Sequence, residues 1–286
     1  MSSVSISRRS TAYPTLLREL TDAPFHLYLR KGEPELLSRP SVAIVGARSC
    51  SAYGAQVARM LGRELAGAGL VVVSGLARGI DGEAHRGALA AGGVTVAVLG
   101  CGVDRDYPAR HAELAARIVE AGEIVSEYEP GIEPAPWRFP ARNRIVAGLT
   151  LATVVVEART KSGALITADF ALELHREVFA VPGEITSALS AGTNDLLRQG
   201  AVPLLSARDV LDVLGLELAS RPPSGTAVSS AASAVLRLLA DGARGTDDLT
   251  RKSGRESGEV AAALVELELA GLAAHADGVY RVVGTV

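Results

Sequence analysis

Short apolar runs alternate with helix-forming stretches over most of this chain, from Val42 to about residue 204. Runs such as VAIVG, VTVAVLG and LATVVVEA carry apolar residues on both faces, which is typical of parallel strands buried between helix layers. The alternation predicts an α/β fold with an extended Rossmann-like, doubly wound parallel sheet. The expected strands are 42–46, 70–74, 94–99, 123–126, 151–156, 178–181 and a weaker one near 202–204. The expected helices are 54–67, 82–92, 110–121, 141–148, 164–176 and 193–199.

The sheet region is expected to be one of four parts of the chain. Residues 1–40 predict a short cap, with a helical lead-in broken by prolines, and residues 41–216 predict the Rossmann-like domain. Residues 217–230 are rich in proline, serine and glycine, which favours a linker. Residues 231–286 show leucines at helical spacing followed by an Asp277-Gly278 pair suited to a tight hairpin turn. They predict a small winged-helix domain.

Composition narrows the functional classes. The formal net charge of −3 argues against a protein that coats nucleic acid or anionic membranes indiscriminately, so a polyanion site must be local. The chain holds two cysteines, Cys50 and Cys101, and shows neither a secretory signal nor the roughly 20 apolar residues that cross a bilayer. We therefore expect a soluble cytoplasmic protein with free thiols, no disulfide and no membrane association.

Four loops, each following a short apolar strand, place arginine or lysine beside glycine or serine. They are GARSCSAYG (46–54), SGLARGID (74–81), FPARNRIVAGL (139–149) and EARTKSGALIT (157–167). Loops at the carboxyl ends of parallel strands converge on one crevice. The four loops therefore predict a single anion-binding surface.

The first loop resembles a nucleotide-binding turn but lacks its signature. Helix amino termini and loop amides favour phosphate, and Arg48 and Ser49 stand where a strand gives way to a helix. Neither the GxGxxG fingerprint nor a Walker A loop is present, and Ser74 closes the second strand where a ribose-binding acid is expected. Gly46 and Gly54 are interpreted as turn residues, and Arg48 as a ligand contact.

The second loop supplies another candidate anion contact. Arg78 lies between Gly75 and Gly79, which suggests a loop shaped to bring the backbone close to a ligand. Asp81 and His85 stand one helical turn apart and are interpreted as structural, with Asp81 capping the helix. Arg78 is therefore expected to contact phosphate.

The third segment combines aromatic rings with cations in a chain that is only 4% aromatic. Trp137 and Phe139 lie among three arginines, Arg138, Arg142 and Arg144. Bases stack on aromatic rings while guanidinium groups hold the backbone, so this mixture favours single-stranded nucleic acid. Arg138 and Phe139 are the preferred contacts.

A structural alternative remains open for the third segment. Its arginines can pair with Glu127 and Glu129 while Phe139 anchors the segment to the core. Asn143 and Arg144 can order the loop without touching a ligand.

The fourth loop adds Lys161 and Ser162 ahead of a helix that opens near Ala164, so another helix amino terminus faces the crevice. The acidic residues near the site come from separate loops without paired spacing, and the five histidines show no metal-ligand spacing. We expect binding at this surface, with no metal site and no catalytic residue.

Seven motifs follow one another along the chain: VAIVGARSCSAYG, SGLARGIDGEAH, VAVLGCGVDRDYP, VSEYEPG, FPARNRIVAGL, EARTKSGALITA and VFAVPG. Together they resemble the bacterial DprA/Smf family of DNA-processing proteins, and the likeness runs from about Tyr13 to Leu214. The tail resembles the winged-helix domain of that family. The resemblance implies a recombination mediator, usually a homodimer, that binds and protects incoming single-stranded DNA. It also implies help in loading the RecA recombinase during natural transformation, with no enzymatic activity and no cofactor.

Matched by motif, the cation-rich loops would line the DNA. The predicted single-stranded DNA contacts are Arg48, Ser49, Arg78, Gly79, Arg138, Phe139, Arg142, Asn143, Lys161 and Ser162. Three features depart from the family pattern. A SAM-like domain that many relatives carry ahead of this region is expected to be absent or vestigial, and His111 stands where asparagine is common. Pro136 stands where a lysine is often found, so Arg138 would have to supply its charge.

Two enzymatic alternatives share this type of sheet. Nucleotide hydrolases of the lysine-decarboxylase-like group resemble the fold, but their PGGxGT signature is missing and SGALIT stands in the comparable place. A nicotinamide-dependent dehydrogenase would need the absent fingerprint and acidic residue. In residues 231–286, six Lys or Arg stand against eight Asp or Glu, a net charge of −2. A winged helix that reads duplex DNA usually has a basic face, so a protein-contact or regulatory role is at least equally favoured.

Overall fold

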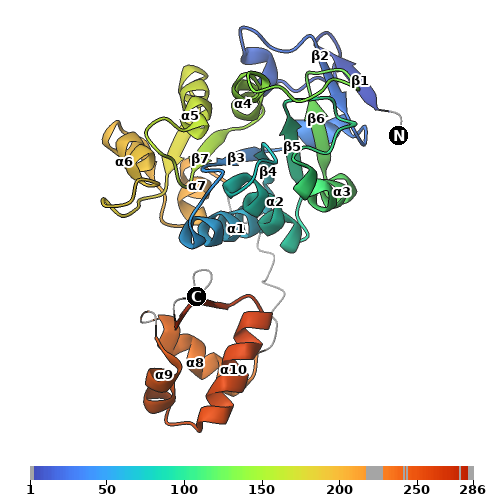
Figure 1. The fold of residues 1–286 in the computed structure, drawn as a ribbon. Coiled ribbons are helices and arrows are strands. Elements are labelled where there is room, and N and C mark those ends of the chain that lie inside the picture. Colours follow the sequence, from blue (N-terminus) through green and yellow to red (C-terminus); the bar gives the residue numbers. More distant parts are fainter. Residues whose placement is uncertain (1–2, 217–227, 241, 243, 277, 283–286) are drawn as a thin grey trace. The chain divides into compact units, whose positions relative to one another are not determined.

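The computed structural model describes residues 3–216, 228–240, 242, 244–276 and 278–282 of this 286-residue chain. The chain divides into two compact units, Met1–Ala219 and Ser220–Val286 (Figure 1). Most of the expected linker, residues 217–227, lies outside the described residues. Among the described residues, no helix combines the length and the apolar character needed to cross a membrane.

The first unit is built on a nine-stranded sheet with the order β1-β2-β6-β5-β4-β3-β7-β8-β9. The seven strands from β3 to β9 run parallel to their neighbours, while β1 and β2 are antiparallel additions beside β6. This arrangement confirms the predicted Rossmann-like parallel sheet. The strands are β1 Val4–Ser7, β2 His26–Leu29, β3 Ser41–Val45, β4 Val71–Ser74, β5 Thr95–Leu99, β6 Glu123–Ser126, β7 Ala152–Val155, β8 Glu177–Ala180 and β9 Val202–Pro203.

Helices cover both faces of this sheet (Figure 1). Successive side chains of a strand point to opposite faces, so Val42 and Ile44 pack with α1, α2 and α7 while Ala43 and Val45 pack with α4 and α5. The two apolar layers explain why the strand sequences carry apolar residues on both faces. The helices are α1 Ala52–Gly67, α2 Ile80–Ala90, α3 Ala112–Ala121, α4 Arg138–Gly148, α5 Gly163–Glu173, α6 Ala191–Arg198 and α7 Ala207–Val213.

The amino-terminal segment differs from the predicted helical lead-in. It forms β1, the 3-10 turn η1 (Leu16–Glu19), β2 and the 3-10 turn η2 (Pro34–Ser38). In β2 the side chains of Leu27 and Leu29 are buried, which is the period of two of a strand. The prolines leave pieces too short for a stable helix, so the segment extends the sheet instead.

A buried carboxylate attaches this segment to the sheet. The Glu123 side chain is fully buried at the start of β6. Its Oε1 accepts a hydrogen bond from the Lys31 amide at 2.8 Å, and its Oε2 accepts from the Gly32 and Glu33 amides at 2.8 and 2.9 Å. Three backbone donors that follow β2 are therefore satisfied by one side chain, which no local pattern in residues 1–40 reveals.

The second unit has the three helices and hairpin that the sequence predicted for a winged helix. They are α8 Ser230–Ala240, α9 Thr246–Ser253, α10 Ser257–Leu269, β10 Ala273–Ala276 and β11 Val279–Val282. Its core contains Val235, Leu239, Leu249, Leu264 and Leu267. Asp277 of the expected turn lies outside the described residues.

Replacing Glu123 with alanine is expected to lower the free energy of unfolding by roughly 2–4 kcal/mol, because three amides lose a charged acceptor in a buried place. Urea unfolding of the full chain measures the change. Glu120→Ala is the matched control, since Glu120 is exposed, and it should change stability by less than about 0.5 kcal/mol. Equal stabilities of the two variants would contradict this role for Glu123.

Candidate functional site

A pocket of the first unit lies at the point where the strand order reverses. The chain builds β3 to β6 in one direction and then returns to place β7 on the other side of β3. Loops that follow β3 and β7 therefore diverge and leave a crevice at the carboxyl ends of the strands. This crevice holds a pocket of about 660 Å³, and a second pocket of about 160 Å³ shares six of its lining residues.

The amino terminus of α1 is already occupied by a carboxylate of the same chain. Glu157, which follows β7, is buried, and its Oε2 accepts a hydrogen bond from the Ser51 amide at 2.9 Å. Its Oε1 accepts from the Ser51 hydroxyl at 2.5 Å, and Ser51 is the N-cap of α1. A side chain at Gly54 would collide with this carboxylate. Phosphate would have to compete with Glu157 at this helix terminus, while contact of Arg48 with a ligand stays a prediction.

Backbone amides of the loop before α2 also have hydrogen-bond partners within the protein. The sequence suggested that Asp81 caps α2, and this is wrong. The helix begins at Ile80 with Gly79 as its N-cap. The Asp81 carboxylate instead accepts hydrogen bonds from the Gly75 and Ala77 amides at 3.2 and 3.3 Å. Gly79 has a φ of +72°, and a side chain there would collide with the Ala47 carbonyl. The glycine serves the contact between two loops of the protein.

Arg142 is buried beside Asp81. Its Nη1 donates to the Gly75 carbonyl at 2.7 Å and to the Val98 carbonyl, so one side chain joins the ends of β4 and β5. Gly75 leaves the space that this guanidinium fills. Burial lowers the pKa of Arg142, and the negative charge of Asp81 opposes that shift. Burial likewise raises the pKa of Asp81, and the charge of Arg142 opposes it. The two form a buried electrostatic couple.

His85 has the structural place that the sequence suggested. It is fully buried, and its Nδ1 lies 2.7 Å from the Thr95 hydroxyl. Burial lowers the pKa of His85 to about 3, so the ring is neutral at physiological pH.

The amino terminus of α5 opens on the larger pocket. Ser162 is the N-cap of α5, and its hydroxyl accepts a hydrogen bond from the Ala164 amide at 3.3 Å. The Asn143 side chain reaches across from α4 and donates to the Gly163 carbonyl at 2.9 Å. Ser162, Gly163 and Ala164 all line the pocket. This helix terminus, unlike that of α1, faces the space available to a ligand.

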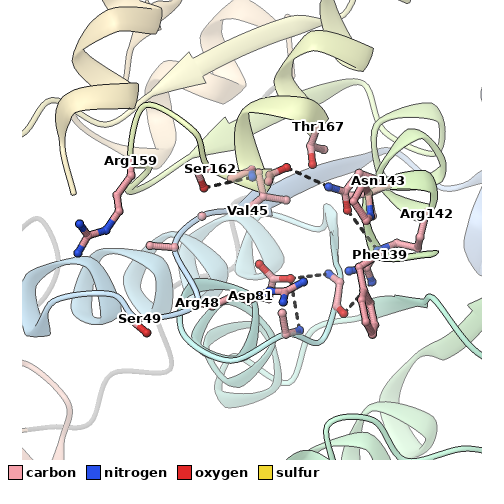
Figure 2. Close-up of a pocket in the computed structure, with 18 of the residues that line it drawn as sticks. Val45, Arg48, Ser49, Asp81, Phe139, Arg142, Asn143, Arg159, Ser162 and Thr167 are labelled. Carbon is pink, nitrogen blue, oxygen red and sulfur yellow. Dashed lines mark hydrogen bonds between the residues drawn. The ribbon is translucent and has the colours of Figure 1, made fainter. Parts of the chain in front are cut away.

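The third segment is a helix rather than a loop. α4 begins at Arg138, three residues earlier than predicted. Phe139, Arg142, Asn143 and Val146 stand at positions i, i+3, i+4 and i+7, so they share one face, and all four line the larger pocket. Figure 2 shows Phe139, Arg142 and Asn143 on one side of the pocket and Ser162 and Arg159 of the β7–α5 loop on the other.

Exposed cations surround the two pockets. Arg48, Arg159 and Lys161 line the larger pocket, and Arg78 lines the smaller one together with Arg48. In the part of the chain that the structure describes, none of these four forms an ion pair. Arg144 provides a contrast on α4, since it pairs with Glu127 at 2.8 Å and with Asp22 at 2.7 Å. The cations at the pockets are therefore available to an anionic ligand.

The aromatic side chains divide between the pocket and the neighbouring surface. The Phe139 ring is stacked with Tyr107, with ring centres 5.1 Å apart, and the Arg48 guanidinium lies 5.4 Å from the Phe139 ring centre. Arg138 turns away and lies 4.9 Å from the ring centres of both Tyr128 and Trp137. It also donates to the Glu133 carbonyl.

The structure gathers most of the predicted contacts at one place. The larger pocket is lined by seven of the ten: Arg48, Ser49, Phe139, Arg142, Asn143, Lys161 and Ser162. Arg78 lines the smaller pocket, whereas Gly79 and Arg138 line neither of these two. Contact with a ligand stays a prediction for all ten. The sequence left open that Asn143 orders the protein itself, and its hydrogen bond to the Gly163 carbonyl does this. Arg142 has a similar ordering role through the Gly75 and Val98 carbonyls.

Arg159 and Tyr107 are a cation and an aromatic side chain at the pockets that the predicted contacts left out. Arg159 belongs to the fourth loop, where its position two residues before Lys161 was a usable signal. Tyr107 belongs to the loop after β5, and an aromatic residue at the carboxyl end of a central strand was the signal there. Among the described residues, no three His, Cys, Asp or Glu side chains gather in a way that could hold a metal ion.

Two family models match this chain, one over most of each compact unit. Residues 5–215 match the family described as DNA recombination-mediator protein A, and residues 219–278 match the DprA winged helix domain. The chain is 40% identical to Protein Smf of Escherichia coli over 281 residues, which cover 95% of this chain and 75% of that protein.

Two solved structures resemble the first unit. One is DNA processing protein A from Streptococcus pneumoniae, with a TM-score of 0.71 and 44% identity, covering 74% of each chain. The other is DNA processing protein A from Helicobacter pylori, with a TM-score of 0.67 and 32% identity, covering 75% of this chain and 96% of that one. The latter structure is described as showing a single-stranded DNA binding mode.

Arg142 and Arg48 are expected to respond differently to mutation. Arg142→Met should lower the free energy of unfolding by roughly 3–5 kcal/mol, because it leaves the Asp81 carboxylate buried without its opposite charge. Arg48→Ala should change it by less than about 0.5 kcal/mol, because Arg48 is exposed. Urea unfolding measures both.

The loss of unfolding free energy caused by Arg142→Met should also depend on pH. Losing the guanidinium raises the pKa of Asp81 further, and a raised carboxyl pKa costs the folded state stability as pH rises through that pKa. The deficit should therefore be larger at about pH 8 than at about pH 5. A deficit independent of pH would contradict the coupling of Arg142 to Asp81.

Proposed function

This chain belongs to the DNA recombination-mediator protein A family, the DprA/Smf proteins, and we propose that it binds single-stranded DNA in the crevice between the β3 and β7 loops. The solved relative from Helicobacter pylori, described with a single-stranded DNA binding mode, supports the choice of ligand. The proposal concerns the first unit, where that likeness lies.

One observation carries the proposal. Arg48, Arg78 and Lys161 are exposed, unpaired among the described residues, and stand around pockets that also contain the Phe139 ring. Cations spread along a groove with an aromatic side chain are what a single strand requires, since its phosphates and its bases are bound by different groups. A protein with a net charge of −3 can hold a polyanion only where its cations are gathered in this way.

The occupied helix termini favour a strand over a single nucleotide. In a dinucleotide-binding sheet, the pyrophosphate lies on the amino terminus of the helix after the first strand of the fingerprint. Here Glu157 occupies that position at α1, and Asp81 takes the amides of the next loop. A nucleotide hydrolase of the lysine-decarboxylase-like group would have to hold its phosphate at the start of α5, where SGALIT stands in place of the PGGxGT signature. We propose binding without chemistry on the base.

The wider role follows from the family. We propose that the protein acts as a homodimer, protects incoming DNA and helps load RecA during natural transformation. Sedimentation of the full chain with and without an oligonucleotide tests the dimer. RecA filament assembly on a strand coated with single-strand binding protein tests the loading. A monomer under all conditions, or an unchanged assembly rate, would remove the corresponding part.

Arg48→Ala, Arg78→Ala and Lys161→Ala should each weaken binding of an unstructured oligonucleotide. Each should also make the slope of log K against log salt concentration shallower by about 0.7, since one phosphate contact is lost. Fluorescence anisotropy with a labelled thymidine oligonucleotide across a salt series measures both quantities.

Arg39→Ala is the matched control for these variants. Arg39 is exposed, and it precedes β3, so it lies at the opposite edge of the sheet from the crevice. Its variant should bind with unchanged affinity and slope. The proposal fails if all four variants behave alike.

The second unit is proposed to contact protein rather than duplex DNA. The third helix of the winged helix, α10, contains no lysine or arginine, and its exposed side includes Val265 and Leu269, which are 53% and 86% exposed. A helix that enters the major groove usually carries cations for phosphates and base edges, and this helix has no cation to offer.

A chain ending at Leu216 should therefore keep its affinity for single-stranded DNA within about threefold and show no loss of duplex binding. The first unit has its own cores, which supports its use alone. Anisotropy with matched single-stranded and duplex oligonucleotides measures both. A loss of more than tenfold for either ligand would assign DNA contacts to the second unit.

A further inference from the structure

Tyr107 lies at the boundary of the two pockets. It follows β5 in a loop that the sequence prediction did not assign to the site, and it lines both the larger and the smaller pocket. Its side chain is 41% exposed although one face of the ring is stacked on Phe139 at an interplanar angle of 21°. A large part of the Tyr107 side chain is therefore open to solvent despite this contact.

Phe139 is covered by its own chain. Tyr107 is stacked on the ring and the Arg48 guanidinium lies over it, 5.4 Å from the ring centre. Both groups therefore cover part of the Phe139 ring. Tyr107, at 41% exposed, offers the two pockets a further aromatic surface.

We propose that Tyr107 is the platform on which a base of the bound strand stacks, so that the base extends the Phe139–Tyr107 stack by one ring. The inference rests on the proposed function, since it names a contact within the same site. Phe139 then acts by holding Tyr107 in place through the stacked contact. Arg48 in turn stabilises the Phe139 ring through its cation–π contact.

The cations beside Tyr107 are placed to bind the phosphates of such a strand. Arg48 and Arg78 line the smaller pocket with Tyr107, and Lys161 lines the larger pocket on which Tyr107 also borders. A base on Tyr107 would therefore have cations toward both pockets. Base stacking tolerates any sequence, because every base presents an aromatic face.

Other exposed aromatic side chains are poorer candidates. Trp137 is 62% exposed, but it contacts Tyr128 and Arg138 and lines neither of the two described pockets. Phe25 is 58% exposed and stands directly before β2, next to His26. Of these three exposed aromatic side chains, Tyr107 is the one that lines both pockets.

Binding of two oligonucleotides of equal length separates stacking from charge. One is a thymidine oligonucleotide, and the other has the same backbone with abasic sites. Tyr107→Ala should weaken binding of the thymidine strand by roughly 5- to 150-fold, the range for loss of one stacked base. It should leave binding of the abasic strand unchanged within about twofold. Tyr107→Phe should bind both strands like the unmodified chain, because the ring remains.

Three controls keep this test decisive. Phe25→Ala removes an exposed aromatic ring elsewhere and should change neither affinity. Tyr107→Leu keeps an apolar side chain over Phe139, so it should show the same selective loss as Tyr107→Ala if stacking on the ring is what is lost. Irradiation of a strand containing 5-iodouracil should attach it covalently to the peptide that holds Tyr107.

The outcomes distinguish this inference from the proposed function. If Tyr107→Ala and Tyr107→Leu bind the thymidine strand as well as the unmodified chain does, or lose both strands equally, the stacking role is overturned. The cation variants can still behave as proposed in that case, and single-strand binding survives. If the unmodified chain binds neither strand, the function and this inference fall together.

Discussion

The hydrogen bonds between the Glu157 carboxylate and Ser51 are the interaction on which the site depends. They join the loop after β7 to the start of α1 across the point where the strand order reverses. They also fill the helix terminus at which a related sheet would bind a pyrophosphate. The α1 terminus is therefore satisfied within the protein, whereas Ser162, Gly163 and Ala164 at the start of α5 line the pocket.

The charged side chains of the crevice form two groups, those that are paired inside the protein and those that are exposed to solvent. Arg142 and Asp81 are buried and tie together the ends of β4, β5 and the α2 loop, so their charges serve the fold. Arg48, Arg78 and Lys161 are exposed around the same pockets, so their charges remain available. Because α4 begins at Arg138, its one face carries Phe139, Arg142 and Asn143 into the pocket together. Buried charges thus hold the frame together, and exposed cations remain for a strand.

The sequence predicted what depends on local periodicity. The seven parallel strands, the winged-helix order and the convergence of the cation-rich segments all follow from apolar runs and their spacing. It did not predict β1 and β2, because a two-strand addition whose turn is held by Glu123 is specified by a residue some 90 positions away. The sequence pattern grouped Arg142 with Arg48 as a DNA contact. It did not reveal that Arg142 is buried, because that burial depends on the space left by Gly75 and on the charge of Asp81, not on the neighbours of Arg142 in sequence. Tyr107 was missed for the same reason, because its partner Phe139 comes from another element.

The central claim is that this crevice is a groove for a strand rather than a pocket for one nucleotide. Calorimetric titration with thymidine monophosphate and with thymidine oligonucleotides of increasing length tests it directly. The account predicts no saturable binding of the monophosphate at millimolar concentration, and an affinity that rises with length until the strand spans the exposed cations and Tyr107. Micromolar binding of the monophosphate, with no further gain from length, would contradict it.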